Sequence, residues 1–200
     1  MTYATPRALV LGSTSSYRRA LLERLRLPFT VAAPDVDETP LAGETPAQTA
    51  VRLALAKAHA VARSRADSVV IGSDQVADLQ GEAIGKPGNF ERARSQLQRM
   101  SGQTVVFHTA VAVVCSAQQF VAHALVPVTV RFRNLTDSEI SHYLLAETPY
   151  DCAGSAKSEG LGIALLERID NSDPSALVGL PLIETARMLR EAGIPILGNA

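Results

Sequence analysis

The sequence predicts an α/β fold built on a mixed β-sheet. Strand-like and helix-like segments alternate as far as residue 100, which is typical of a parallel sheet covered by helices. Two long β-rich runs, 104–115 and 120–132, then follow one another directly, which indicates antiparallel pairing. Hydrophobic residues make up 46% of the chain and charged residues 20%, enough apolar material for a packed core. We therefore expect a single domain over residues 1–200, with a division into two lobes near 79–104.

The N-terminal half is expected to alternate between strands, helices and polar loops. Short apolar runs predict the strands, and an apolar period of 3.6 residues predicts the helices. Thr45-Pro46 is a helix start signal and Ser101-Gly102 a stop signal. The expected elements are strands at 7–11, 29–33 and 68–73, helices at 17–27, 45–65 and 89–100, a polar loop at 34–46 and a hairpin turn at 80–82.

The C-terminal half begins with the expected hairpin, which turns at residues 116–119. Thr136 and Glu139 form the pattern of a capping box, so a helix should begin there, and it should end before Pro149. The remaining expected elements are a small-residue loop at 153–162, a strand at 163–169 and a helix at 182–192.

Charge and cysteine content narrow the function classes. The formal net charge is -1, whereas proteins that coat nucleic acid usually carry a basic excess, so no nucleic-acid partner is expected. Cys115 and Cys152 form no CxxC pair, which favours a reducing compartment over a disulfide framework. We find no signal-peptide pattern and no apolar run of membrane-spanning length. The expected location is the cytoplasm, with no membrane partner.

The first candidate site is the segment GSTSSYRR at residues 12–19, which joins a strand to a helix. Free amides at a helix N-terminus bind anions, and small residues let phosphate approach the backbone. Arg18 and Arg19 add planar cations that suit phosphate oxygens. The alternative is an ordinary N-cap with two solvated arginines. The segment does not match the GxxxxGK[ST] pattern of a P-loop.

The second candidate is the segment GSDQ at residues 72–75, which comes near the end of an apolar strand. A carboxylate in that position, here Asp74, can activate water or hold a divalent metal. The alternative is an aspartate that only forms a turn.

Three lysines and three carboxylates complete the candidate chemistry. Each lysine lies beside small or rigid residues, and each could equally be a plain surface lysine. Phosphoryl chemistry combines cations on the phosphates, a metal held by carboxylates and a positioned water. The residues are Lys57, Lys86, Lys157, Glu38, Asp74 and Glu159. The sequence contains neither an HExxH zinc motif nor a GxSxG nucleophile motif.

Taken together, these motifs resemble the Maf family of nucleotide pyrophosphatases. One such motif alone is weak evidence, but the ordered set spans nearly the whole chain. The matching segments are STSSYRRALL at 13–22, VDE at 36–38, RLA at 52–54 with KA at 57–58, IGSDQV at 71–76, GKP at 85–87, SG at 101–102 and GLPL at 179–182.

The resemblance implies a twisted mixed sheet flanked by helices, with a substrate cleft between two lobes. It also implies hydrolysis of a nucleoside triphosphate to the monophosphate and pyrophosphate, with a divalent cation, Mg²⁺ or Mn²⁺. Homodimers are common in such folds, and the sequence leaves a homodimer open. The implied roles are Asp74 as general base, Ser13, Ser15, Arg18, Lys57 and Lys86 as phosphate ligands, Glu38 and Asp74 as metal ligands, and Tyr17, Gln75 and Glu159 as specificity residues.

Within the family, the chain is most similar to the branch that acts on 7-methyl-GTP. Gln75, Glu159 and an aromatic residue at position 17 fit that branch, although tryptophan is expected where Tyr17 stands and an aromatic where Ala156 stands. N7-methylation gives guanine a formal positive charge, which suits an acid and an aromatic face. Two alternatives stay open: the same reaction on another nucleotide, such as dTTP or UTP, and a nucleotide-binding regulator of cell division without turnover.

Overall fold

A seven-stranded mixed sheet forms the centre of the computed structural model, which describes residues 7–198. Six strands follow the order β2-β1-β3-β5-β6-β7, and β4 pairs with β3. β1 runs parallel to β2 and β3, and the other pairings are antiparallel, so the prediction of a mixed sheet is confirmed. The strands are β1 (Leu9–Leu11), β2 (Phe29–Val31), β3 (Val69–Leu79), β4 (Glu82–Ile84), β5 (Thr104–Cys115), β6 (Phe120–Phe132) and β7 (Leu166–Asp170).

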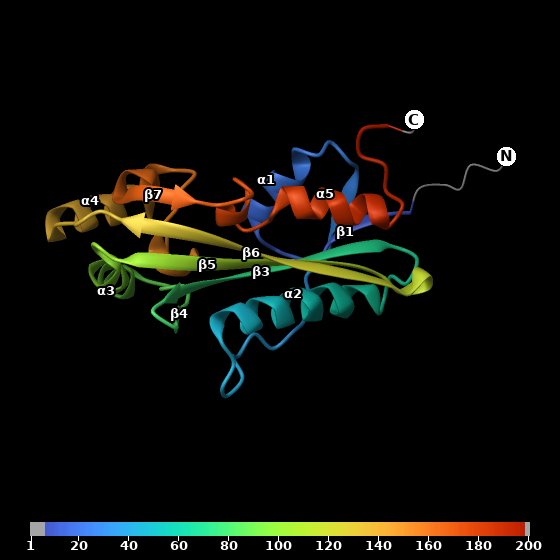
Figure 1. Ribbon diagram of the computed structural model, residues 1–200, viewed down its shortest axis with the longest axis horizontal. Helices are drawn as coiled ribbons and strands as arrows, with labels where there is room; N and C mark the ends of the chain where they lie inside the picture. Colours follow the sequence, from blue (N-terminus) through green and yellow to red (C-terminus); the bar gives the residue numbers. More distant parts are fainter. Residues whose placement is uncertain (1–6, 199–200) are drawn as a thin grey trace.

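Helices cover both faces of the sheet (Figure 1). One face carries α2, the other carries α1 and α5, and α3 and α4 gather at one end of the long strands. The predicted capping box of Thr136 and Glu139 is confirmed at the start of α4. None of the helices within residues 7–198 has the length and apolar character needed to cross a bilayer. The helices are α1 (Ser16–Glu23), α2 (Pro46–Ala62), α3 (Phe90–Met100), α4 (Asp137–Glu147) and α5 (Leu182–Glu191).

The long strands contribute to different hydrophobic clusters along their length. On β3, Val69 and Ile71 pack beneath α1 and α5, and Val70 packs against α2 on the opposite face. Farther along the same strand, Ala77 and Leu79 join the cluster that includes residues of α3 and α4. The polar residues 73–75 therefore lie between the two ends of the core.

Several expected elements have other boundaries in the structure, among them α1 and β7. The helix expected at 17–27 ends at Glu23, because the backbone turns at Arg26 into the left-handed region that terminates helices (φ 55°). The strand expected at 163–169 begins only at Leu166, which pairs with Phe132 of β6, and it continues to Asp170. Its first residues belong instead to a short 3₁₀ helix, Leu161–Leu165.

Candidate active site

A buried lysine lies between two carboxylates at the centre of the candidate site. Nζ of Lys57 is 2.6 Å from Oδ1 of Asp74 and 2.7 Å from Oε1 of Glu38. Lys57 is 4% exposed and Asp74 is 7% exposed, whereas Glu38 reaches the pair from the half-exposed loop before α2. Burying a charged side chain is costly unless an oppositely charged group lies beside it. Lys57 and Asp74 meet this condition, because each contacts the other directly.

A glycine allows α2 to lie close enough to β3 for this contact. A Cβ atom at Gly72 would lie 2.3 Å from the carbonyl oxygen of Ala54 and 2.5 Å from the amide nitrogen of Ala58. Both alanines are fully buried, and their small side chains let the helix backbone rest directly on the strand. Because Lys57 and Asp74 flank this contact, the close approach brings the two side chains together.

Asp74 lies in the middle of a strand. The expectation that it lies near the end of its strand is wrong, because β3 continues to Leu79 and pairs with β5 over this whole stretch. Its neighbour on the other side is the element that ends: β1 stops at Leu11, opposite Ile71. Between Ile71 and Ala77, where the pairing with β4 begins, this edge of β3 has no strand partner among residues 7–198, and the cleft opens there.

The two carboxylates have opposite pKa shifts. Burial raises the pKa of Asp74 above the ordinary value for an aspartate, although the positive charges of Lys57 and Arg18 oppose the change. Burial also pushes the pKa of Glu38 upward, but the hydrogen bond and charge of Lys57, with Lys86 and Arg18 nearby, outweigh it and lower that pKa. Burial thus favours the protonated form of Asp74, and the neighbouring cations favour the ionised form of Glu38.

The turn before α1 holds an arginine against the site. Ser15 is the N-cap of α1 and accepts a hydrogen bond from the amide of Arg18 (3.4 Å), so its side chain has the capping role considered above. Arg18 donates from Nε to the carbonyl oxygen of Gly179 (2.9 Å) and from Nη1 to Oγ of Ser13 (3.5 Å). Arg19 instead points to solvent and pairs with Glu23. Only the first of the two arginines therefore faces the cleft.

All ten residues to which the resemblance assigns a role line one cleft of about 640 Å³. They come from six separate parts of the chain and meet only in the folded structure. The residues are Ser13, Ser15, Tyr17, Arg18, Glu38, Lys57, Asp74, Gln75, Lys86 and Glu159. This shared location makes the assigned roles feasible, and the roles themselves stay predictions.

The other two lysines differ from each other. Lys86 follows β4 and is exposed at the cleft wall, where its charge is available to a ligand. Lys157 does not contribute to that wall, because its Nζ lies 2.8 Å from Oε1 of Glu147. The same Nζ lies 5.7 Å from the centroid of the Tyr17 ring, so Lys157 contacts one face of that aromatic side chain.

The side-chain amide of Gln75 has a fixed orientation. Its Nε2 donates to the carbonyl oxygens of Ala176 (3.1 Å) and Leu177 (3.0 Å) and to Oγ1 of Thr109 (2.9 Å). Carbonyl oxygens only accept hydrogen bonds, so the amide nitrogen must face them. Oε1 is left to accept a hydrogen bond from a ligand in the cleft.

Comparison with known proteins identifies the chain's relatives. The family profile described as Maf-like protein matches residues 8–192. The chain belongs to the Maf family. Several Maf relatives carry the name 7-methyl-GTP pyrophosphatase. The protein of Polaromonas sp. is 68% identical over 98% of this chain and 89% of its own length. That of Albidiferax ferrireducens is 64% identical, and that of Cupriavidus metallidurans 56% identical, each over 99% of this chain and its own full length.

Among solved structures, the Staphylococcus aureus Ham1 protein aligns with a TM-score of 0.46 at 16% sequence identity. The alignment covers 64% of this chain and 73% of that chain.

Sequence analysis singled out only the end of one further part of this Maf site, the loop at 173–181, through the GLPL motif at 179–182, and assigned it no role. The carboxylate of Asp173, 2% exposed, accepts hydrogen bonds from the hydroxyl of Ser175 (2.5 Å) and the amide of Ile183 (2.7 Å). These bonds attach the loop to the start of α5. The loop in turn presents the backbone carbonyls that hold Arg18 and Gln75. Backbone carbonyls leave no trace in side-chain patterns, although Asp and Ser before a helix are a recognisable capping signal.

We expect Cys152, at the wall of the cleft, to react slowly with alkylating reagents. Burial, together with the charges of Asp151 and Glu159, raises the pKa of its thiol to about 11. At pH 8 the thiolate fraction falls by roughly 100-fold relative to an ordinary thiol, and the greater nucleophilicity of that thiolate recovers part of the loss. Iodoacetamide should therefore label Cys152 about tenfold more slowly than N-acetylcysteine.

Mass spectrometry measures this labelling directly. The other cysteine, Cys115, is fully buried, so Cys152→Ser should abolish labelling of the folded protein. Labelling as fast as that of the free thiol would contradict the assigned environment.

Proposed function

We propose that this Maf protein hydrolyses 7-methyl-GTP to 7-methyl-GMP and pyrophosphate. The observation that carries the proposal is the buried Asp74 carboxylate, in contact with Lys57 and in one cleft with Arg18 and Lys86. A carboxylate beside several cations is the combination that water attack on a phosphate chain requires. The names of the curated relatives support the same substrate and reaction.

The triphosphate is assigned to the cationic end of the cleft. Arg18 donates from Nε to the Gly179 carbonyl and from Nη1 to Ser13, which leaves Nη2 and the second Nη1 hydrogen to bind phosphate oxygens. Lys86 adds an exposed ammonium, and Ser13 adds a hydroxyl. Lys57 would share its charge between the carboxylates and a phosphate oxygen. These groups neutralise the charge that builds up on the departing pyrophosphate.

In the proposed step, Asp74 removes a proton from a water molecule in the cleft. The water oxygen forms a bond to the α-phosphorus while the bond from that phosphorus to the bridging oxygen breaks. Pyrophosphate leaves with the electron pair of the broken bond, and the proton stays on the Asp74 carboxylate until solvent takes it. The raised pKa of Asp74 favours this proton transfer.

Glu38 and Asp74 also fit a divalent cation. Mg²⁺ is usually held by one or two protein carboxylates together with substrate phosphates, and these two acids already converge on one positive charge at Lys57. Among residues 7–198, no group of three or more His, Cys, Asp or Glu side chains is arranged to hold a metal without substrate. When bound, such a cation would neutralise phosphate charge.

The base is assigned to the end of the cleft lined by Tyr17, Gln75 and Glu159. Glu159 is exposed there, and no ion pair ties up its carboxylate within the described chain. Its charge would attract a base that carries a formal positive charge, and its oxygens would accept from the guanine N–H edge. Because Lys157 contacts one face of Tyr17, the opposite face is the one proposed to stack on the base.

Glu159→Gln is expected to lower kcat/KM for 7-methyl-GTP about tenfold, equivalent to about 1.4 kcal/mol. The change removes the negative charge and keeps the side-chain shape, so kcat/KM for UTP should stay within about threefold. Pyrophosphate release over a panel of nucleotides at equal concentration measures both. Glu167→Gln, an exposed acid on β7, is the matched control and should change neither rate.

Two results would contradict the proposed role of Glu159 or the proposed reaction. Equal losses for both nucleotides would remove Glu159 from base recognition and favour another nucleotide as substrate. Tight nucleotide binding without turnover on any member of the panel would favour the non-catalytic regulator. The ion-paired Asp74 and Lys57 argue for turnover, because a purely binding site needs no desolvated base.

A further inference from the structure

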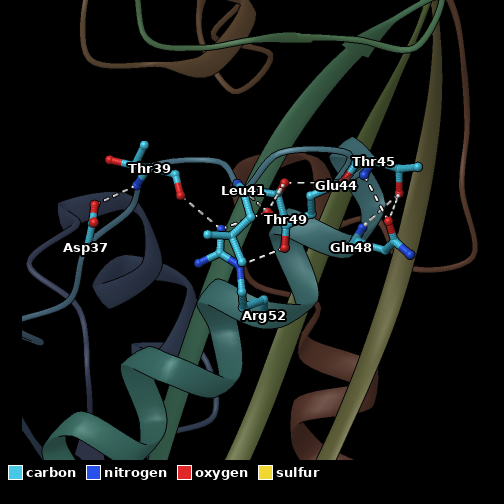
Figure 2. Close-up of polar contacts among 8 residues, drawn as sticks. All are labelled: Asp37, Thr39, Leu41, Glu44, Thr45, Gln48, Thr49 and Arg52. Atoms are coloured by element: carbon cyan, nitrogen blue, oxygen red, sulfur yellow. Dashed lines mark hydrogen bonds and ion pairs between the residues drawn. The ribbon is translucent and has the colours of Figure 1, made fainter.

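The loop before α2 is attached to that helix by one carboxylate (Figure 2). Glu44 accepts two hydrogen bonds from Arg52, from Nε (2.6 Å) and from Nη2 (2.8 Å). It also accepts from the hydroxyl of Thr49 (2.9 Å) and the backbone amide of Leu41 (3.1 Å). A paired arginine fork and carboxylate fix geometry more strongly than a single contact does. Arg52 lowers the pKa of Glu44 to about 2, so the acid stays ionised at neutral pH.

Arg52 makes a second contact, which reaches the residue next to Glu38. Its Nη2 donates to the carbonyl oxygen of Thr39 (3.1 Å), and the amide of Thr39 donates to the Asp37 carboxylate (2.9 Å). The backbone on either side of Glu38 is therefore held in place (Figure 2). Residues 32–41 contain no helix or strand that could do this instead.

The fold does not depend on this contact. α2 has its own N-terminal capping box, formed by Thr45 and Gln48, and its buried face rests on the sheet through Ala54 and Ala58. Glu38, by contrast, has a side chain 57% exposed, and within residues 7–198 its one ion pair is with Lys57. Its position at Lys57 therefore depends on how the loop is held.

We propose that Arg52 and Glu44 are positioning residues that act through Glu38. By fixing the backbone at Thr39, they keep the Glu38 carboxylate at Lys57, where substrate and cation bind. The inference rests on the proposed function, since it assigns Glu38 a role in that reaction.

A double-mutant cycle tests the proposal. Arg52→Met should lower kcat/KM for 7-methyl-GTP about tenfold, because Glu38 loses its fixed place. Added to Glu38→Gln, the same change should cost less than twofold, because nothing remains to be positioned. Arg52→Lys keeps the positive charge but loses the two-pronged guanidinium, so its kcat/KM should lie between those of Arg52→Met and the wild type. Arg187→Met, which breaks two exposed ion pairs on α5, is the matched control. Its kcat/KM should stay within twofold of the wild-type value.

Hydrogen exchange gives a readout that does not need turnover. Arg52→Met and Glu44→Gln should speed exchange across residues 38–44, while the amides of 50–62 and the melting temperature stay as in the wild type. The proposal would be overturned if the losses in kcat/KM from Arg52→Met and Glu38→Gln multiply in the double variant. Unchanged hydrogen exchange across residues 38–44 would also overturn it. A wild-type protein that releases no pyrophosphate would instead overturn the proposed function, and the exchange result would still be measured.

Discussion

Asp74→Asn is expected to lower kcat for pyrophosphate release by about 100-fold to 10 000-fold, the range that a positioned general base contributes. Asparagine has nearly the same shape and can still accept the hydrogen bond from Lys57 through Oδ1. It cannot take the proton from water. Substrate binding should change much less than turnover, because Arg18, Lys86 and Ser13 are untouched.

The same strand offers a matched control for this variant. Asp78 also lies on β3 and makes hydrogen bonds, to His108 and to the amide of Gly81, but it does not line the cleft. Asp78→Asn should therefore leave kcat within about twofold of the wild type. Steady-state kinetics with circular dichroism on both variants separates lost chemistry from lost structure. An Asp74→Asn variant with wild-type turnover would remove Asp74 from the mechanism.

Gly72→Ala is expected to lower the free energy of unfolding by about 3 kcal/mol, at the upper end of the usual cost of overpacking. The added methyl would meet the carbonyl oxygen of Ala54 and the amide nitrogen of Ala58, which are backbone atoms that no side-chain rotation can move. Either α2 shifts away from β3 or the strand distorts. For a chain of 200 residues, the melting temperature should fall by roughly 6–12 °C.

This substitution should also reduce activity beyond the effect on stability. Nζ of Lys57 and Oδ1 of Asp74 are 2.6 Å apart, so a shift of α2 relative to β3 would disturb this contact. Gly85→Ala provides the comparison for stability, because a Cβ atom at Gly85 would meet nothing within 4 Å. Thermal melts of the two variants measure the difference. A Gly72→Ala protein that melts within about 2 °C of the wild type would contradict the close approach of helix and strand.

The order of elements was predictable from the sequence because side-chain periodicity reports local structure. The segments at 104–115 and 120–132 match β5 and β6, and the Thr136 capping box marks the start of α4. The extent of β3 was not predictable, because polar residues interrupt its apolar run after Ile71. Pairing with β5, set by residues some 35 positions away, continues the strand through Asp74.

The candidate site was predictable in its residues and less so in its geometry. Motif order indicated Asp74, Lys57 and Glu38, and the fold places them in direct contact. The orientation of Gln75 depends on carbonyls of residues 176–177, which are a hundred positions away. Lys157 was a candidate cation by its neighbours, yet Glu147 on α4 holds it away from the cleft wall. Such contacts follow from tertiary packing, which a local pattern does not encode.

The products formed from 7-methyl-GTP provide the most direct test of the proposed activity. With Mg²⁺ or Mn²⁺ present, we expect the wild-type protein to release pyrophosphate and 7-methyl-GMP in equal amounts. In ¹⁸O-labelled water, the label should enter the monophosphate, because the water held by Asp74 attacks the α-phosphorus. Release of orthophosphate and 7-methyl-GDP, or label found in the pyrophosphate, would contradict the proposed reaction.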